Sequence, residues 1–131
     1  LRMPLLDDLG LKEALLRYLE EYRNHGLEVE AHLEVPPLPK EKEVALFRVV
    51  QEALTNILRH AQAKRVSVHL WPEGNCLLGR VVDDGQGFEP ENTPPSVGIL
   101  GMQERVQSLG GSLVLFSQPG RGTRVEFRVP L

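Results

Sequence analysis

Four polar side chains follow one another at helical spacing in the middle of the chain, and their types suit acid–base and charge-binding chemistry. Glu52, Asn56, Arg59 and His60 stand among apolar residues that recur at three- and four-residue steps. Side chains with this spacing lie over one another on a helix, so the pattern predicts a helix with one buried face and one polar stripe. A solvated helix surface is the alternative interpretation of the same stripe.

Two glycine-rich turns later in the chain offer binding chemistry of a different kind. Asp83 is followed by Gly85 and Gly87 at the end of an expected strand. A carboxylate there can accept hydrogen bonds from a ligand amino group, while the glycines allow a flat ring to approach the main chain. Gly98 and Gly101 open an expected helix, whose unpaired N–H groups favour phosphate. Each turn alone is also explained by the need for glycine between elements.

Length and composition limit the class of protein. With 131 residues the chain forms one domain, and its net charge of −3 gives no basic surface for nucleic acid. The single cysteine, Cys76, cannot form an internal disulfide, so a reducing compartment is expected. The sequence has no apolar run of about 18 residues and no signal-peptide pattern, and it begins with Leu1. We expect a cytoplasmic domain excised from a longer protein that is soluble or membrane-anchored.

Hydrophobic periodicity predicts both helices and strands. Helical spacing covers residues 10–23, 40–61 and 98–109. Alternation of apolar and polar residues, or a short apolar run, marks strands at residues 27–35, 65–71, 76–82, 112–117 and 124–129. Residues 1–9 read as a short lead-in, and the proline-rich residues 89–97 as a mobile loop. This order predicts an α+β sandwich in which helices cover one face of a largely antiparallel sheet.

Four motifs together resemble the catalytic domain of sensor histidine kinases. Residues 51–61, which read Gln-Glu-Ala-Leu-Thr-Asn and then Arg-His-Ala, resemble the N box of that family. Asp83-x-Gly85-x-Gly87-Phe88 resembles the first glycine box, residues 98–106 the second, and residues 120–123 the final glycine–threonine turn. The residue sequences of all four motifs are similar to those of the nitrate-sensor-like and degradative-enzyme-sensor-like kinases.

The resemblance spans nearly the whole chain and carries expectations about fold and boundaries. It implies the Bergerat-type ATP-binding fold, a two-layer sandwich whose mixed, mostly antiparallel sheet is covered on one face by about three helices. Residues 5–11 resemble the subfamily's junction into the catalytic domain. Residues 1–9 would then be the remainder of a junction from a dimerisation and phosphoacceptor domain, and residues 10–131 the catalytic domain.

The resemblance also implies a role for each residue of the polar stripe. Asn56 would hold Mg²⁺ through its amide oxygen, a hard ligand that suits this cation. Glu52 would orient or deprotonate the attacking imidazole or water. Arg59 and His60 would meet the phosphates of ATP.

The glycine boxes receive nucleotide-binding roles from the same resemblance. Asp83 would bind the amino group of adenine. Gly85 and Gly87 would line the base pocket. Gly98, Gly101 and Met102 would form the far hinge of a lid and its phosphate-binding turn. Thr123 would place a hydroxyl near the base.

The function implied is transfer of the ATP γ-phosphoryl group to a histidine of the upstream domain, for relay to a response regulator. His25, His32 and His69 do not stand in a helix beside an acidic residue, so the acceptor histidine is expected outside this chain. The expected partners are that upstream domain and the regulator, without nucleic acid. The fragment is expected to be monomeric and the full-length kinase to be a homodimer.

Three other functions share parts of this pattern. An anti-sigma-type protein-serine kinase has the same fold, but residues 51–61 and 101–105 differ from its motifs. A hydrolytic ATPase would use Glu52 on water, but such enzymes carry large transducer domains. An interaction module that binds nucleotide without chemistry is favoured only by Ser96, which stands where the subfamily often has glycine. Asp84 stands where many relatives have asparagine, and we expect it to face solvent without a role.

Overall fold

The computed structural model describes residues 4–56, 62–87 and 97–131. Its helices are α1 (Pro4–Asn24), α2 (Lys40–Asn56) and α3 (Val97–Ser108). Its strands are β1 (Glu28–Leu33), β2 (Arg65–Glu73), β3 (Cys76–Asp83), β4 (Ser112–Ser117) and β5 (Thr123–Pro130). Every helix and strand predicted from periodicity is therefore present in the described part of the chain. None of these helices is long and apolar enough to cross a membrane.

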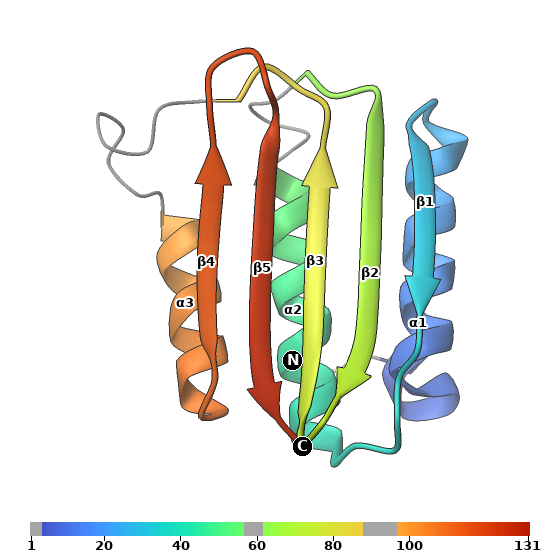
Figure 1. Ribbon diagram of the computed structural model, residues 1–131. Helices are drawn as coiled ribbons and strands as arrows, with labels where there is room; N and C mark the ends of the chain where they lie inside the picture. Colours follow the sequence, from blue (N-terminus) through green and yellow to red (C-terminus); the bar gives the residue numbers. More distant parts are fainter. Residues whose placement is uncertain (1–3, 57–61, 88–96) are drawn as a thin grey trace.

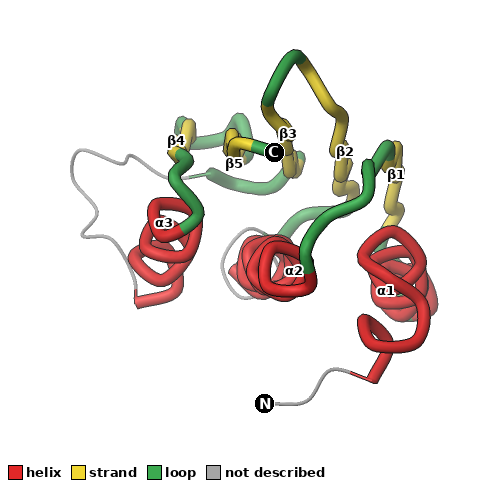
Figure 2. Tube along the Cα trace, turned by 90° about the horizontal axis from the view of Figure 1, so that it is seen from below, coloured by secondary structure: helices red, strands yellow, loops and turns green. Residues whose placement is uncertain are grey.

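The strands form one sheet in the order β1-β2-β3-β5-β4. β1 and β2 run parallel, whereas the other three pairs run antiparallel. Figure 1 shows the strands side by side, and Figure 2 shows that α1, α2 and α3 all lie against the same face of the sheet. The expected two-layer sandwich with a mixed, mostly antiparallel sheet is confirmed.

The core lies between the helices and this face of the sheet. Strand residues alternate between the two faces, so β2 buries every second side chain, as in Val66, Val68 and Leu70. Helix α2 contributes the largest share of buried helical side chains, at three- and four-residue steps. These residues are Leu46, Phe47, Val49, Val50, Ala53 and Leu54. The central helix is thereby fixed over the middle strands, with its half-buried polar stripe turned away from the core.

Helix α1 begins earlier than the sequence predicted. Residues 4–9 are helical rather than an irregular lead-in, with Pro4 at the first position, where its missing N–H costs nothing. The helix is interrupted at Gly10, whose φ of 78° lies in the left-handed region. Beyond this break, the backbone N–H of Leu11 donates to Glu43 Oε2 of α2 at 2.9 Å. This bond serves as a cap for the second part of the helix.

Strand β2 is longer than predicted and continues through Pro72 to Glu73. A proline inside a sheet normally costs a ladder hydrogen bond. The parallel partner β1 ends where Leu33 pairs with Leu70, so Pro72 has β3 as its only neighbouring strand. The turn between β2 and β3 therefore shrinks to Gly74 and Asn75, with Gly74 at a φ of 60°.

The elements that carry the predicted site residues meet at one end of the molecule. The C-terminal ends of α2 and β3, the N-terminal end of α3 and the turn between β4 and β5 all lie toward the top of Figure 1. Two parts of the predicted site lie outside the described residues. These are residues 57–61, with Arg59 and His60, and residues 88–96, with Phe88, Ser96 and most of the predicted loop.

Candidate functional site

Glu52 and Asn56 stand one turn apart at the C-terminal end of α2. Both side chains are half-buried, whereas the neighbouring Ala53 and Leu54 are in the core. The hydroxyl of Thr55 donates to the backbone oxygen of Gln51 at 2.9 Å, which ties this turn to the one before it. The helix therefore places a carboxylate and an amide on the same side of its last described turns.

The carboxylate of Glu52 lies directly against the first turn of α3. A Cβ atom built on Gly98 would overlap Glu52 Oε1 and would lie 2.8 Å from Glu52 Cδ. Gly98 is therefore the position on α3 at which the absence of a side chain lets Glu52 approach. A carboxylate is also favoured near a helix N-terminus by the helix dipole. The sequence predicted Gly98 as a hinge and phosphate contact, and its contact with Glu52 depends on tertiary packing.

Asp83 is the buried charged residue of the site, with an exposed fraction of 4%. Its Oδ1 atom accepts a hydrogen bond from the backbone N–H of Gly85 at 2.7 Å. Its Oδ2 atom is buried and has no partner within the described part of the chain. Burial raises the pKa of the Asp83 carboxyl, while the Gly85 N–H opposes the rise. Because a buried acceptor without a partner is costly, Oδ2 fits a ligand that donates a hydrogen bond.

The two glycine turns beside Asp83 interlock through their backbones. Gly87 has a φ of 64°, and a Cβ there would overlap the carbonyl oxygen of Gln118 in the turn between β4 and β5. Gly122 has a φ of 77°, and a Cβ there would overlap the carbonyl oxygen of Asp83. The N–H of Gly120 also donates to the carbonyl oxygen of Gln86 at 2.5 Å. These glycines allow the close approach that holds the Asp83 turn in place.

Asp84 has a structural role that the sequence reading did not assign. Its side chain is exposed, as expected, but Oδ1 accepts the backbone N–H groups of Lys64 and Arg65, each at 2.9 Å. These bonds, led by that from Arg65, lower the pKa of the Asp84 carboxyl. Asp84 thus ties the start of β2 to the end of β3. The sequence feature that could have indicated this role is the pair of adjacent carboxylates at a strand end, because neighbouring side chains of a strand point to opposite sides.

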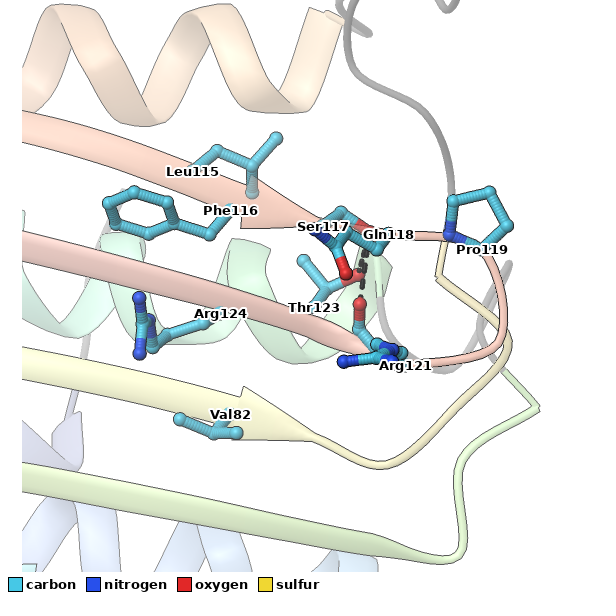
Figure 3. A pocket seen from close by; sticks show the side chains of 10 residues that line it. Val82, Leu115, Phe116, Ser117, Gln118, Pro119, Arg121, Thr123 and Arg124 are labelled. Carbon is cyan, nitrogen blue, oxygen red and sulfur yellow. Dashed lines mark hydrogen bonds between the residues drawn. The ribbon is translucent and has the colours of Figure 1, made fainter.

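Thr123 lies beside Asp83 on the neighbouring strand. Asp83 pairs with Thr123 across β3 and β5, and Ser117 pairs with Thr123 across β4 and β5. Residues that pair directly share one face of a sheet. The hydroxyls of Ser117 and Thr123 are 3.0 Å apart, and Figure 3 labels both side chains. Sequence reasoning missed Ser117, because only the register of the last two strands places it here.

A hollow lies next to Ser117 and Thr123 at this end of the sheet. A wide hollow of about 900 Å³ is lined by residues of β3, β4, β5 and the turn between the last two strands (Figure 3). Ser117 and Thr123 belong to its wall, together with Phe116 and Arg124, whose guanidinium lies 4.5 Å from the centre of the Phe116 ring. Asp83 is not part of this lining, and Phe116 and Arg124 lie on the opposite face of the sheet from Ser117 and Thr123.

The two remaining predicted residues of α3 differ in their surroundings. Gly101 is half-buried, and a Cβ built on it would have no atom within 4 Å. Met102 is 1% exposed and belongs to the core. The described structure thus brings together Glu52 with Gly98, and Asp83 with Gly85 and Thr123. Met102 packs in the core and helps to hold α3 in place.

Comparisons with known proteins agree with this arrangement. Residues 41–131 match the family model described as "Histidine kinase-, DNA gyrase B-, and HSP90-like ATPase". The chain is 37% identical over 133 residues to the sensor histidine kinase LiaS of Bacillus subtilis. It is 38% identical over 136 residues to the oxygen sensor histidine kinase NreB of Staphylococcus carnosus. Each alignment covers 100% of this chain but only 37% and 39% of the respective relative, so the chain spans well under half of their length.

Solved structures show the same fold. The histidine kinase domain of a blue-light-activated kinase from Erythrobacter litoralis superposes with a TM-score of 0.76 at 26% identity, covering 90% of this chain and 64% of that one. A second structure of that kinase gives a TM-score of 0.80 at 25% identity, covering 92% of this chain and 42% of that one.

Asp83 Oδ2, which is buried and has no partner among the described residues, is an acceptor that a hydrogen-bond donor on a ligand would satisfy. The chain belongs to the family of histidine kinase-, DNA gyrase B- and HSP90-like ATPases, and its whole length aligns with part of two sensor histidine kinases.

Proposed function

We propose that this domain binds Mg·ATP and that the longer protein transfers the γ-phosphoryl group to a histidine on its own dimerisation and phosphoacceptor domain. A response regulator would then receive the phosphoryl group. The names of the relatives support a histidine kinase, and their greater length leaves room for the acceptor domain. The single observation that carries nucleotide binding is Asp83 Oδ2, a buried acceptor without a partner in the described residues.

At the base end, Asp83 would accept a hydrogen bond from the adenine amino group through Oδ2. Its other oxygen is already bound by the Gly85 N–H, which fixes the orientation of the carboxylate. Gly85 and Gly87 would let the ring lie near the main chain, and Thr123 would present its hydroxyl beside Asp83. Adenine nucleotides should therefore bind more tightly than guanine nucleotides.

At the phosphate end, the polar stripe of α2 would act on the triphosphate. Glu52 would orient or deprotonate the attacking imidazole. Asn56 would hold Mg²⁺, which when bound neutralises phosphate charge. Arg59 and His60, which lie outside the described residues, would contact the phosphates.

The first turns of α3 would complete the phosphate side. Gly98 and Gly101 would offer backbone N–H groups to phosphate at the N-terminus of this helix. Met102 would hold the helix at the right depth through its place in the core rather than by touching the nucleotide.

The boundary of the domain is part of the same proposal. Residues 1–9 would be the remainder of the junction from the upstream domain, and residues 10–131 the catalytic domain. The break in α1 at Gly10 supports this boundary, and so does the bond from the Leu11 N–H to Glu43, which joins the helix to α2 just beyond the break. The full-length kinase would be a homodimer, and the domain itself a monomer.

Incubation with γ-labelled ATP tests this function. The full-length protein should acquire an acid-labile, base-stable label, as expected for phosphohistidine, whereas the 131-residue chain should bind Mg·ATP and remain unlabelled. Binding without labelling of the full-length protein would favour a nucleotide-binding interaction module. An acid-labile label on His25, His32, His60 or His69 of the chain itself would contradict the proposed position of the acceptor.

A further inference from the structure

Three polar side chains form a row across the site end of the sheet. Asp83, Thr123 and Ser117 pair in register on β3, β5 and β4, so their side chains share one face. The hydroxyl of Ser117 lies 3.0 Å from the Thr123 hydroxyl and 3.0 Å from the carbonyl oxygen of Gly122 (Figure 3). Asp83 and Thr123 have assigned roles in the proposed function, whereas Ser117 has none.

The number of protons fixes the direction of these two hydrogen bonds. Each hydroxyl carries one proton, and a carbonyl oxygen can only accept. The bond between Ser117 and Gly122 therefore uses the Ser117 proton. The bond between the two hydroxyls must then use the Thr123 proton, which points toward Ser117. The Thr123 oxygen retains its lone pairs but has no proton left to offer a ligand.

We propose that Ser117 is a positioning residue that sets base specificity by fixing the Thr123 hydroxyl as an acceptor. This inference rests on the proposed binding of the base by Asp83. With Ser117 in place, both groups beside the base are acceptors: the unpartnered Asp83 Oδ2 and the Thr123 oxygen. The ligand that satisfies them carries an amino group.

The same pair of acceptors rejects a carbonyl group. Inosine triphosphate differs from ATP by a carbonyl oxygen in place of the 6-amino group, with a proton on the neighbouring ring nitrogen. That carbonyl oxygen would face two acceptors with no proton to donate to it, and Asp83 Oδ2 would lose the donor that the amino group supplies. Without Ser117 the Thr123 hydroxyl can rotate and donate to the carbonyl, so part of the discrimination should be lost.

The experiment compares the dissociation constants of Mg·ATP and Mg·ITP by calorimetry on the 131-residue chain. Ser117→Ala should reduce the preference for ATP over ITP about three- to tenfold, as expected for one neutral hydrogen bond that changes direction. Ser117→Thr keeps the hydroxyl and should retain the wild-type preference. Ser112→Ala, at the other end of β4 and exposed, is the matched control and should also retain it.

A double-variant comparison separates this role from a structural one. In a Thr123→Val background, Ser117→Ala should leave the ratio of the two dissociation constants unchanged, because the hydroxyl that Ser117 orients is gone. If Ser117→Ala weakens ATP and ITP by the same factor, or leaves their ratio at the wild-type value, the positioning role is wrong. Failure of the wild-type chain to bind ATP would instead contradict the proposed function, a different result.

Discussion

At the scale of single residues, the candidate site depends on a polar side chain that the described residues do not fully pair by hydrogen bonds. Asp83 is buried with one oxygen bound and one oxygen without a partner in the described residues. Such an oxygen costs stability in the absence of ligand and strengthens the hydrogen bond when a ligand donates to it. The carboxylate of the next residue, Asp84, already accepts hydrogen bonds from two backbone N–H groups. Of these adjacent carboxylates, Asp84 stabilises the fold, and Asp83 is the one that we propose to bind the ligand.

Replacement of the buried carboxylate should weaken nucleotide binding. Asp83→Asn replaces an acceptor by an amide that cannot offer the same charged oxygen to the adenine amino group. We expect a loss of about 1.5–3 kcal/mol in the binding free energy of ATP, the range for a hydrogen bond to a charged group. Titration calorimetry of the wild-type chain and the variant measures it. Equal affinities would remove Asp83 from the base pocket.

The raised pKa of Asp83 predicts a pH dependence of stability with a definite sign. Between the ordinary value of 3.8 and the raised value, the folded chain binds more protons at this site than the unfolded chain. The contribution of Asp83 to the free energy of unfolding therefore falls as pH rises through this window. Relative to the wild-type chain, Asp83→Asn should become more stable as pH rises above the ordinary value of 3.8, as measured by urea unfolding without nucleotide. A relative loss over the same range would contradict the assigned cause.

At the scale of elements, the order of helices and strands could be predicted because burial alternates along each strand and recurs along each helix. The ends of elements were less predictable, since they depend on neighbours. β2 could continue through Pro72 only because β1 ends at Leu33. The motifs identified Glu52, Asp83 and Thr123, to which the proposed function assigns the chemistry. Ser117 and the contact of Gly98 with Glu52 could not be predicted, because strand register and helix packing create them.

The packing of α2 against α3 gives a prediction with a matched pair of glycines. Alanine is normally about 0.5–1 kcal/mol more favourable than glycine inside a helix. Gly101→Ala should stabilise the chain by about this amount, because no atom lies within 4 Å of the added Cβ. Gly98→Ala should destabilise it, because the added Cβ would overlap the carboxylate of Glu52. Thermal unfolding measures both changes.

A second substitution identifies the cause of that destabilisation. In a Glu52→Ala background the carboxylate is absent, so Gly98→Ala should recover a stabilising effect close to that of Gly101→Ala. If Gly98→Ala is equally destabilising with and without the Glu52 side chain, contact between α2 and α3 at this point is not what requires glycine.

At the scale of the whole molecule, the domain is one part of a larger protein in its relatives, of which it spans 37% and 39% in LiaS and NreB. The helices and the sheet of the sandwich position the candidate site, which lies at the end of the molecule where α2, α3, β3 and the turn before β5 meet (Figure 1). The proposed function assigns residues at this end to the base, the metal and the phosphates. In the proposed function the histidine that accepts the phosphoryl group lies outside this chain, so catalysis would depend on how the two domains meet.

The rate of phosphotransfer in the full-length kinase carrying Glu52→Gln tests the central claim most directly. Glutamine keeps the size of the side chain, and with it the packing against Gly98, and leaves Asn56 in place as the proposed metal ligand. At saturating Mg·ATP, we expect nearly unchanged nucleotide affinity and a phosphotransfer rate lower by about 10²–10⁴-fold, as for the loss of a general base. Asn56→Ala, measured alongside, should weaken Mg·ATP binding itself. Phosphotransfer at the wild-type rate by Glu52→Gln would contradict the catalytic role of Glu52.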